Sequence, residues 1–328
     1  MSGFDTWREA FCRRHATLAA YLPQPIAPLP EVARQAANQA EYTLSVATYM
    51  DKVMPASRIA KGRAALAQNQ HLLDDLHKRY QVPGEIIVAI WGIETDFGAI
   101  QGDIPVLRAL ATLAHTGPRA SYFEAELLAA LQLVAAGTTT PDFTGSWAGA
   151  SGHCQFMPSA VLEYGVDHDG DGHADIWGDD PTDALASIAS YLSAHGWQAQ
   201  APWLTETPPA QPETLLIPAG LPGPAFRTGP NFQVLLSYNR ATLYALGVGL
   251  LAHAIAETAA PPHWPDRLPL GRAELGKLQE TLTAKGYDTK GADGLLGPDT
   301  RAAIRAWQKA NGLPADGFPS KELLLHLG

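Results

Sequence analysis

The sequence predicts a mainly α-helical protein that has one minor β element and a small helical unit at its C-terminal end. Three observations predict this class. The first 80 residues are rich in Ala, Gln and Leu and contain few strand formers. Apolar residues recur at helical spacing in several segments. Eight prolines lie between residues 202 and 230, where no long helix fits, and more lie between 258 and 269.

The elements are predicted in chain order from spacing and from Pro and Gly signals. Phe4, Trp7 and Phe11 have helical spacing, and Val82-Pro83-Gly84 breaks the helical pattern before a new helix begins near Glu85. Further helices are predicted over 104–113, 122–136, 184–195 and 232–256, a short strand over 214–217, and two C-terminal helices over 275–286 and 298–311. We therefore expect a catalytic region at 1–257, a Pro-rich linker at 258–269 and a compact domain at 270–328.

Composition excludes several classes of protein. The 328 residues suffice for two or three domains, and 46% of them are hydrophobic, so a sizeable core can form. The net charge of −10 argues against nucleic acid as the main partner, because phosphate binding requires a basic face. Residues 267–328 hold nine Lys and Arg against seven Asp and Glu, a net of +2, which leaves −12 for the rest. No stretch predicts a transmembrane segment, and two cysteines do not indicate a disulfide scaffold.

One predicted helix carries an acid on its apolar side. In EIIVAIWGIETDFG, residues 85–98, Glu94 lies ~20° from Ile87 and ~40° from Ile90 around the helix at ~100° per residue. Loss of hydration there raises the pKa of a carboxyl group and favours the protonated state that a general acid needs. The alternative is a structural ion pair with Arg108 or Arg119.

A glycine-rich segment follows about fifty residues later. It reads GSWAGASGHCQFMPS over Gly145–Ser159, and its glycines permit the backbone to approach a ligand closely. Ser146 and Gln155 offer neutral hydrogen-bonding groups that suit sugars. The alternative is a glycine-rich connection with incidental polar residues. His153-Cys154 is expected to be structural, since no third group completes a nucleophile system.

The two segments together resemble the soluble lytic transglycosylase B family, enzymes that cleave peptidoglycan glycan strands. That family pairs a G-x-E-T motif, here Gly92–Thr95, with a G-S-x-A-G-A-x-G-x-x-Q-F-M-P-S motif, here Gly145–Ser159. The resemblance implies a lysozyme-like catalytic core with Glu94 as the catalytic residue and with Ser146 and Gln155 as substrate-binding residues. His153-Cys154 stands where a well-known form of the motif has Tyr-Gly.

The same resemblance implies a cleft lined by further side chains. They are Tyr49, Arg119, Tyr191, Tyr238, Asn239 and Tyr244. Without the resemblance the tyrosines would count as ordinary half-buried aromatic residues. In a cleft, their rings suit stacking on sugars and the Asn239 amide suits an acetamido group. Ala120 replaces the second arginine of a family pair that begins with Arg119.

An acidic loop has the spacing of a calcium site. Asp167, Asp169 and Asp171 occupy positions 1, 3 and 5 of an EF-hand-like loop, and position 12 is Gly178 instead of Glu. The backbone carbonyl of His173 would be the ligand at position 7. The family resemblance implies a longer loop that Asp183 closes. We expect a structural Ca²⁺ and no cofactor for catalysis; the alternative is a solvated acidic turn.

The C-terminal segment resembles the small three-helix peptidoglycan-binding domain over residues 270–328, on motifs such as Asp293-Gly294-Leu295-Leu296-Gly297. The two resemblances agree on peptidoglycan as the substrate, and the transglycosylase resemblance implies non-hydrolytic cleavage of the β-1,4 bond between N-acetylmuramic acid (MurNAc) and N-acetylglucosamine (GlcNAc), with 1,6-anhydromuramyl products. Alternatives are a hydrolytic muramidase that uses Asp142 or Glu163 as a second acid, or a catalytically silent wall-binding protein. Peptidoglycan strands are the expected partner, other cell-wall enzymes are candidates, and a soluble periplasmic protein is expected whose leader the given sequence lacks.

Overall fold

The computed structural model describes residues 3–37, 44–117, 119–265 and 267–328. Pro118, next to Arg119, and Asp266, in the predicted linker, lie outside the described residues. The chain forms two compact units. Unit 1 comprises residues 1–39 and 61–197, and unit 2 comprises residues 40–60 and 198–328. The mainly α-helical class that the sequence predicts is confirmed.

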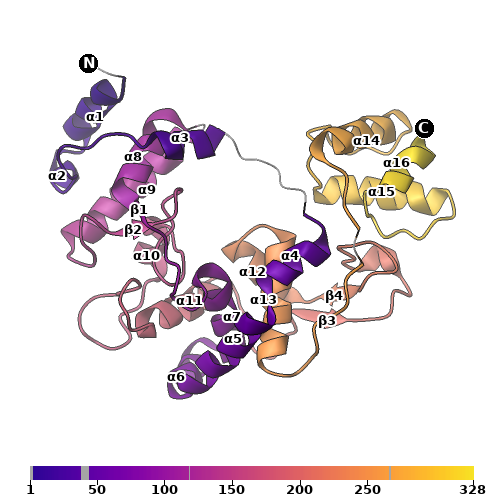
Figure 1. Cartoon of the computed structure of the whole chain (residues 1–328), viewed down its shortest axis with the longest axis horizontal. Coiled ribbons are helices and arrows are strands. Elements are labelled where there is room, and N and C mark those ends of the chain that lie inside the picture. Colours follow the sequence, from indigo (N-terminus) through magenta and orange to yellow (C-terminus); the bar gives the residue numbers. More distant parts are fainter. Residues whose placement is uncertain (1–2, 38–43, 118, 266) are drawn as a thin grey trace. The chain divides into compact units, whose positions relative to one another are not determined.

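Unit 1 consists mainly of helices (Figure 1). They are α1 (Gly3–Arg14), α2 (Ala16–Ala19), α3 (Pro30–Ala37), α6 (Gln70–Tyr80), α7 (Gly84–Thr95), α8 (Val106–Thr116), α9 (Ala120–Ala135), α10 (Pro158–Tyr164) and α11 (Thr182–Ala194). Helix α5 (Ala56–Gln68) begins in the segment assigned to unit 2 and ends in unit 1.

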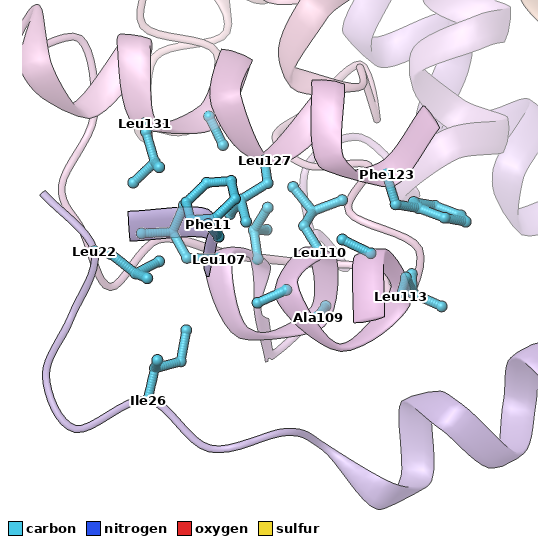
Figure 2. Close-up of a cluster of buried hydrophobic side chains, with 14 of the residues drawn as sticks. Phe11, Leu22, Ile26, Leu107, Ala109, Leu110, Leu113, Phe123, Leu127 and Leu131 are labelled. Carbon is cyan, nitrogen blue, oxygen red and sulfur yellow. The ribbon is translucent and has the colours of Figure 1, made fainter. Parts of the chain in front are cut away.

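Helices α8 and α9 form the centre of a hydrophobic core in unit 1. Leu107 and Leu110 lie three residues apart on α8, and Leu127 and Leu131 lie four apart on α9, so each helix presents one apolar face. Figure 2 shows these side chains gathered between the two helices, with Phe11 of α1 among them. Phe11 and the four leucines are essentially inaccessible to solvent, so they form a closely packed core for unit 1.

A small β element lies beside these helices. Strand β1 (Ile104–Pro105) pairs antiparallel with β2 (Thr144–Gly145), and isolated bridges join Gly145 to Ser151 and Ser151 to Phe156. The helix predicted over 104–113 therefore begins two residues later, because its first two residues pair with β2. This element brings the start of the glycine-rich segment next to the loop that follows α7.

Unit 2 holds α4 (Val46–Val53), β3 (Leu204–Glu206), a 3₁₀ turn η1 (Pro212–Thr214), β4 (Phe226–Thr228), α12 (Pro230–Tyr238) and α13 (Thr242–Ile255). The helix predicted over 232–256 is two helices with a bend of 115°, because Asn239 adopts an extended conformation and its Oδ1 accepts a bond from Ala241 N. Among the described residues, no single helix has the length and apolarity to cross a membrane; this bent pair passes that test on length and composition alone.

The strand predicted over 214–217 is wrong in position. Pro212 starts a 3₁₀ turn that includes Thr214, and only Leu216 pairs, through one bridge to Phe226. The named strands are β3 and β4, which pair antiparallel over three residues each. The minor β element predicted near 202–230 is present, because the prolines there interrupt pairing without preventing it.

The C-terminal part of unit 2 contains α14 (Arg272–Ala284), α15 (Pro298–Ala310) and α16 (Lys321–Leu327) around a small hydrophobic core. Two buried glutamines organise its loops in the same way. Gln279 donates to Asp293 Oδ1 and accepts from Gly294 N, and Gln308 donates to Asp316 Oδ1 and accepts from Gly317 N. The two Asp-Gly motifs are therefore tied to successive helices by one repeated hydrogen-bonding pattern.

This C-terminal part also bonds to the segment that follows η1. Leu221 N donates to Asp316 Oδ2, and Arg305 donates to Leu215 O at 3.2 Å. In the predicted linker, Arg267 donates to Leu221 O at 2.7 Å and lies over the Phe318 ring. The predicted linker has no helix or strand in its described residues, yet one of its side chains joins the parts on either side of it.

Candidate active site

Glu94 lies in the last turn of α7, a largely buried helix of unit 1. Residues 86–92 are all buried, whereas Glu94 is half-buried. The helix ends because Asp96, Phe97 and Gly98 adopt left-handed conformations with φ of 50°, 64° and 85°. A phenylalanine rarely adopts this conformation, so the chain reversal after Glu94 is strained and is held by its surroundings.

The glycine of the G-x-E-T motif has a packing reason. A Cβ on Gly92 would lie 2.7 Å from Phe97 Cζ, so only glycine lets that ring fold back over the helix. The Phe97 ring also meets the Trp91 ring edge to face, with centroids 5.5 Å apart. Asp96 points elsewhere, since its carboxylate pairs with Lys61 at 2.6 Å. The motif thus shapes the end of the helix that presents Glu94.

The threonine of the motif joins this helix end to the glycine-rich segment. Thr95 is 1% exposed, and its Oγ1 donates to His153 O at 3.0 Å and accepts from Gly98 N at 3.0 Å. One hydroxyl therefore fixes both the turn after Glu94 and the segment that faces it. The sequence alone assigns Thr95 no role of its own. The signal that could have indicated one is a polar residue on an apolar helix, directly after a candidate catalytic acid.

The glycines of the second motif pack against protein. A Cβ at Gly145 would meet Ala150 O at 2.3 Å, one at Gly149 would meet Leu110 at 2.5 Å, and one at Gly152 would meet Ile176 O at 2.6 Å. The approach of the backbone to a ligand stays a prediction, and the structure adds a packing reason for these glycines. They let the segment fold tightly onto its neighbours.

Ser146 and Gln155, the two predicted substrate-binding residues of this segment, are both half-buried. Ser146 Oγ accepts a bond from Ala150 N at 3.1 Å. Gln155, with φ of 49°, donates both amide hydrogens to the backbone, to Gln101 O and to Gly152 O at 3.0 Å each. The serine hydroxyl hydrogen and the glutamine carbonyl oxygen are the atoms that these bonds do not use.

His153 and Cys154, in the middle of the glycine-rich segment, are buried. Burial raises the pKa of the Cys154 thiol strongly, and the nearby Glu94 carboxylate adds to that effect against two backbone hydrogen bonds that lower it. A thiol that stays protonated is not a nucleophile. The ring of His153 joins Trp91 to Gly178 through two hydrogen bonds.

Arg119 and Tyr191 are the other predicted site residues of unit 1. Arg119 is exposed at the start of α9, with its guanidinium 5.2 Å from the Tyr122 ring centre and 5.1 Å from that of Phe123. Tyr191 of α11 is half-buried, and one face of its ring stacks on His195 at 4.0 Å. One face of Tyr191 is therefore not available to a sugar.

The arginines and acids of the alternative hypotheses have other partners. Arg108 donates to Ala27 O, and Arg119 lies over aromatic rings. The Asp142 carboxylate accepts a hydrogen bond from Thr140, which lowers the pKa of Asp142. The Glu163 side chain is hydrogen-bonded to Tyr164 and raises the pKa of that tyrosine to about 12. Neither acid is among the groups bonded to the end of α7.

The remaining predicted cleft residues belong to unit 2. Tyr49 lies on α4, which packs against α13, and Tyr238 ends α12. The Tyr238 and Tyr244 rings are nearly parallel, with centroids 6.3 Å apart. Tyr244 is 5% exposed and so lies largely in the core, whereas Asn239 is exposed. The predicted cleft residues are thus divided between the two units.

The acidic loop gathers three of its predicted metal ligands. Single carboxylate oxygens of Asp167, Asp169 and Asp171 lie within 4.8 Å of one another, and all three residues are exposed. Gly170, between Asp169 and Asp171, and Gly172, directly after Asp171, have φ of 82° and 98°, which bends the loop around the carboxylates. Three exposed carboxylates converging on one point form the hard oxygen donor set that suits Ca²⁺.

Asp183, the predicted closing ligand, lies outside that group of three. It is 3% exposed in the first turn of α11, and its Oδ1 accepts from His168 N while its Oδ2 accepts from Asp175 N. Burial raises the pKa of Asp183, although these backbone bonds oppose the effect. Asp183 therefore holds both ends of the loop from within. His173 is exposed, and its N–H donates to Asp171 Oδ1.

Comparison with known proteins decides the family. A family profile described as "Transglycosylase SLT domain" matches residues 9–211 and 204–253, which include Glu94 and the whole glycine-rich segment. The chain belongs to this family of peptidoglycan lytic transglycosylases. A profile for a peptidoglycan binding domain matches residues 271–327, the segment that contains α14–α16.

Individual relatives agree with this assignment. The SltB3 structure from Pseudomonas aeruginosa in complex with NAG-NAM-pentapeptide is 38% identical, covers 99% of each chain and has a TM-score of 0.91. Slt35 from Escherichia coli in complex with calcium is 31% identical, covers 78% of this chain and 93% of its own, and has a TM-score of 0.67. The predicted lysozyme-like class is confirmed by these likenesses.

A curated relative is the membrane-bound lytic murein transglycosylase B of Escherichia coli, 35% identical over 63% of this chain. The match spans 66% of that protein's own length. The predicted peptidoglycan-binding domain is confirmed as a family, and the roles of individual site residues remain predictions.

Proposed function

We propose that Glu94 catalyses non-hydrolytic cleavage of the MurNAc–GlcNAc bond, acting first as acid and then as base. The observation that carries the proposal is the position of Glu94, a half-buried carboxyl group at the end of a buried helix. The Thr95 hydroxyl holds that helix end against the backbone of His153. The helix dipole places its negative end there, which favours a neutral acid over a carboxylate. Thr95 and His153, whose side chains bond at this helix end, are not acids, and the adjacent Asp96 pairs with Lys61.

In the proposed reaction, Glu94 gives its proton to the glycosidic oxygen, and the bond from that oxygen to the muramyl anomeric carbon breaks. Positive charge develops on the sugar as an oxocarbenium-like state. The Glu94 carboxylate then takes the proton of the muramyl 6-hydroxyl, whose oxygen bonds to the anomeric carbon and closes a 1,6-anhydro ring. Protons balance, because Glu94 ends the cycle protonated and no water is consumed.

The free atoms of Ser146 and Gln155 suit a sugar ligand. Since Gln155 commits both amide hydrogens to the backbone, its carbonyl oxygen is the atom that can accept from a hydroxyl or acetamido N–H. Ser146 accepts from the backbone and can donate its own hydrogen. We assign substrate contacts also to Tyr49, Arg119, Tyr191, Tyr238, Asn239 and Tyr244. The aligned SltB3, which has been solved with NAG-anhNAM-pentapeptide, supports an anhydro product for this chain.

The deciding experiment is mass spectrometry of the products formed from purified peptidoglycan. Anhydromuramyl ends are lighter than reducing ends by one water, so they identify the proposed reaction. Reducing ends would instead indicate a hydrolytic muramidase, in which Asp142 or Glu163 holds a water. No product from folded protein would indicate a wall-binding protein without catalysis.

We further propose that the loop of Asp167, Asp169 and Asp171 holds a structural Ca²⁺. Support comes from the converging carboxylates and from Slt35, a relative solved in complex with calcium. Asp183 and the His173 carbonyl remain predicted ligands; the bonds of Asp183 also support a role in shaping the loop. The ion would neutralise the repulsion among the three carboxylates, and no step of the reaction requires it.

The C-terminal domain is proposed to hold the enzyme on the wall, and the periplasm is the proposed location, as both suit a peptidoglycan substrate. The net charge of +2 over residues 267–328 suits an anionic polymer better than the −12 of the remainder. The proposed domain boundaries are 1–257, 258–269 and 270–328. The side chains of Arg305 and Asp316 in this domain, and of Arg267 in the linker, are hydrogen-bonded to the backbone of residues 215–221.

A further inference from the structure

The buried ring of His153 bridges α7 and the segment after the acidic loop. Trp91 Nε1 donates to His153 Nδ1 at 2.9 Å, and His153 Nε2 lies 2.7 Å from Gly178 O. Because an indole N–H only donates, Nδ1 must be the acceptor; because a carbonyl only accepts, Nε2 must carry the hydrogen. The two partners therefore select one neutral tautomer of a ring that is 4% exposed.

The backbone of His153 is fixed to the same two elements. Its carbonyl oxygen accepts from Thr95 Oγ1 at 3.0 Å, and its N–H donates to Ile176 O at 2.8 Å. The ring also occupies the space beside Gly98, where an added Cβ would lie 2.2 Å from the imidazole. His153 thus contacts α7 one turn before Glu94, directly after it and at the chain reversal.

We propose that His153 is a positioning residue for Glu94, acting through the bond that it accepts from Trp91. This inference rests on the proposed role of Glu94. Trp91 packs edge to face on Phe97, and Phe97 folds over Gly92, so the orientation of the Trp91 ring determines how the last turn of α7 is closed. The bond to Gly178 keeps the hydrogen on Nε2, which leaves Nδ1 free to accept from Trp91.

Three substitutions separate the two bonds of the ring. In His153→Asn the amide oxygen can occupy the Nδ1 position and keep the bond from Trp91. In His153→Gln the amide N–H can occupy the Nε2 position and keep the bond to Gly178. His153→Phe keeps the ring and loses both bonds. Turnover is measured on soluble glycan fragments with protein whose folding is verified by circular dichroism and urea unfolding.

We expect His153→Phe to lower kcat by about 10²-fold with KM nearly unchanged, because misplacing a catalytic group by about 1 Å costs about that factor. His153→Asn should restore more of kcat than His153→Gln. In a double-mutant cycle, Trp91→Phe should add little to the loss of His153→Phe, since both break the same bond. His253→Phe is the matched control: this histidine also lies against a tryptophan, Trp203, and has two ring hydrogen bonds, and kcat should not change.

The proposal is overturned if folded His153→Phe keeps wild-type kcat, if His153→Gln is the more active amide variant, or if the losses of Trp91→Phe and His153→Phe simply add. The proposed function fails in a different way, since wild-type enzyme would then yield no anhydromuramyl product. A histidine that only stabilises the fold would lower the urea midpoint of the variants without this order in kcat.

Discussion

Two buried polar networks, one in each unit, use similar bonds for different ends. In the C-terminal domain, Gln279 and Gln308 each satisfy an Asp-Gly loop of that domain, and Asp316 of this network also accepts from Leu221 N outside the domain. At the end of α7, the bonds of Thr95 and His153 converge on a helix turn that presents a half-buried acid. A buried hydrogen-bond network whose groups bond only to one another stabilises the fold. A network that borders an ionisable side chain also positions that side chain for chemistry.

The largest expected effect is that of Glu94→Gln on turnover. The change keeps size and hydrogen bonding but removes the transferable proton, so kcat should fall by ~10²–10⁴-fold or more, because one residue serves as both acid and base. The urea midpoint should change little, since Glu94→Gln keeps the size of the side chain and desolvation of a carboxyl group opposes folding. Product formation from glycan fragments measures the effect. Glu163→Gln is the matched control at an exposed acid, and a comparable loss there would favour a two-carboxylate hydrolysis.

Deletion of residues 261–328 should weaken binding to the insoluble wall by ~10²–10⁴-fold, the gain expected from linking two binders. Co-sedimentation with purified sacculi measures it. The truncated protein should also unfold more easily, because Leu221 N and Leu215 O lose Asp316 and Arg305 as partners. Undiminished sedimentation would show that the domain does not hold the enzyme on the wall.

Asp316→Ala tests the network of the C-terminal domain directly. This carboxylate is 7% exposed and accepts bonds from Leu221 N, Gln308 Nε2 and Phe318 N, so its loss should lower the free energy of unfolding by about 3 kcal/mol. Urea unfolding measures the change, and kcat on short soluble fragments should stay the same. Asp299→Ala, at an exposed acid on α15, should have a much smaller effect. Equal losses of stability would mean that the network contributes little.

Calcium should stabilise unit 1 by ~2.7 kcal/mol at a hundredfold excess over Kd. Melting temperatures with Ca²⁺ and with a chelator measure this gain, which Asp167→Ala or Asp171→Ala should abolish. Asp179→Ala removes an exposed acid of the same loop outside the converging group, and should keep the gain. A melting temperature that changes with neither calcium nor chelator would contradict the proposed metal site.

The smallest effect concerns the two thiols. Since burial raises the pKa of Cys154, a thiol reagent near neutral pH should modify only the half-buried Cys12 in the native protein. Intact-protein mass spectrometry should show one adduct in buffer and two in urea, with turnover kept after the first. Rapid modification of native Cys154 would mean that the region behind the glycine-rich segment opens readily.

Much of the site could be predicted from short sequence patterns. Glu94 follows from its place on an apolar helix and from its motif, and the three converging aspartates follow from loop spacing, because neighbours in sequence must be close in space. The break at Asn239 and the position of the β strands could not be predicted, since the bond from Ala241 N to the Asn239 side chain and the cross-strand pairing compete with helix spacing there. The cleft residues lie far apart in sequence, so local spacing does not show whether they meet, and their roles stay predictions.

By itself the sequence determined the helical class, the two family motifs and the acid that they present, because these depend on local spacing and residue chemistry. Only the tertiary structure decided that Gly92 makes room for Phe97, that Thr95 bonds to His153, and that the ring of His153 has its hydrogen on Nε2. Each of these facts depends on two groups that the fold brings together. A tautomer or a steric contact exists only once both partners are in place.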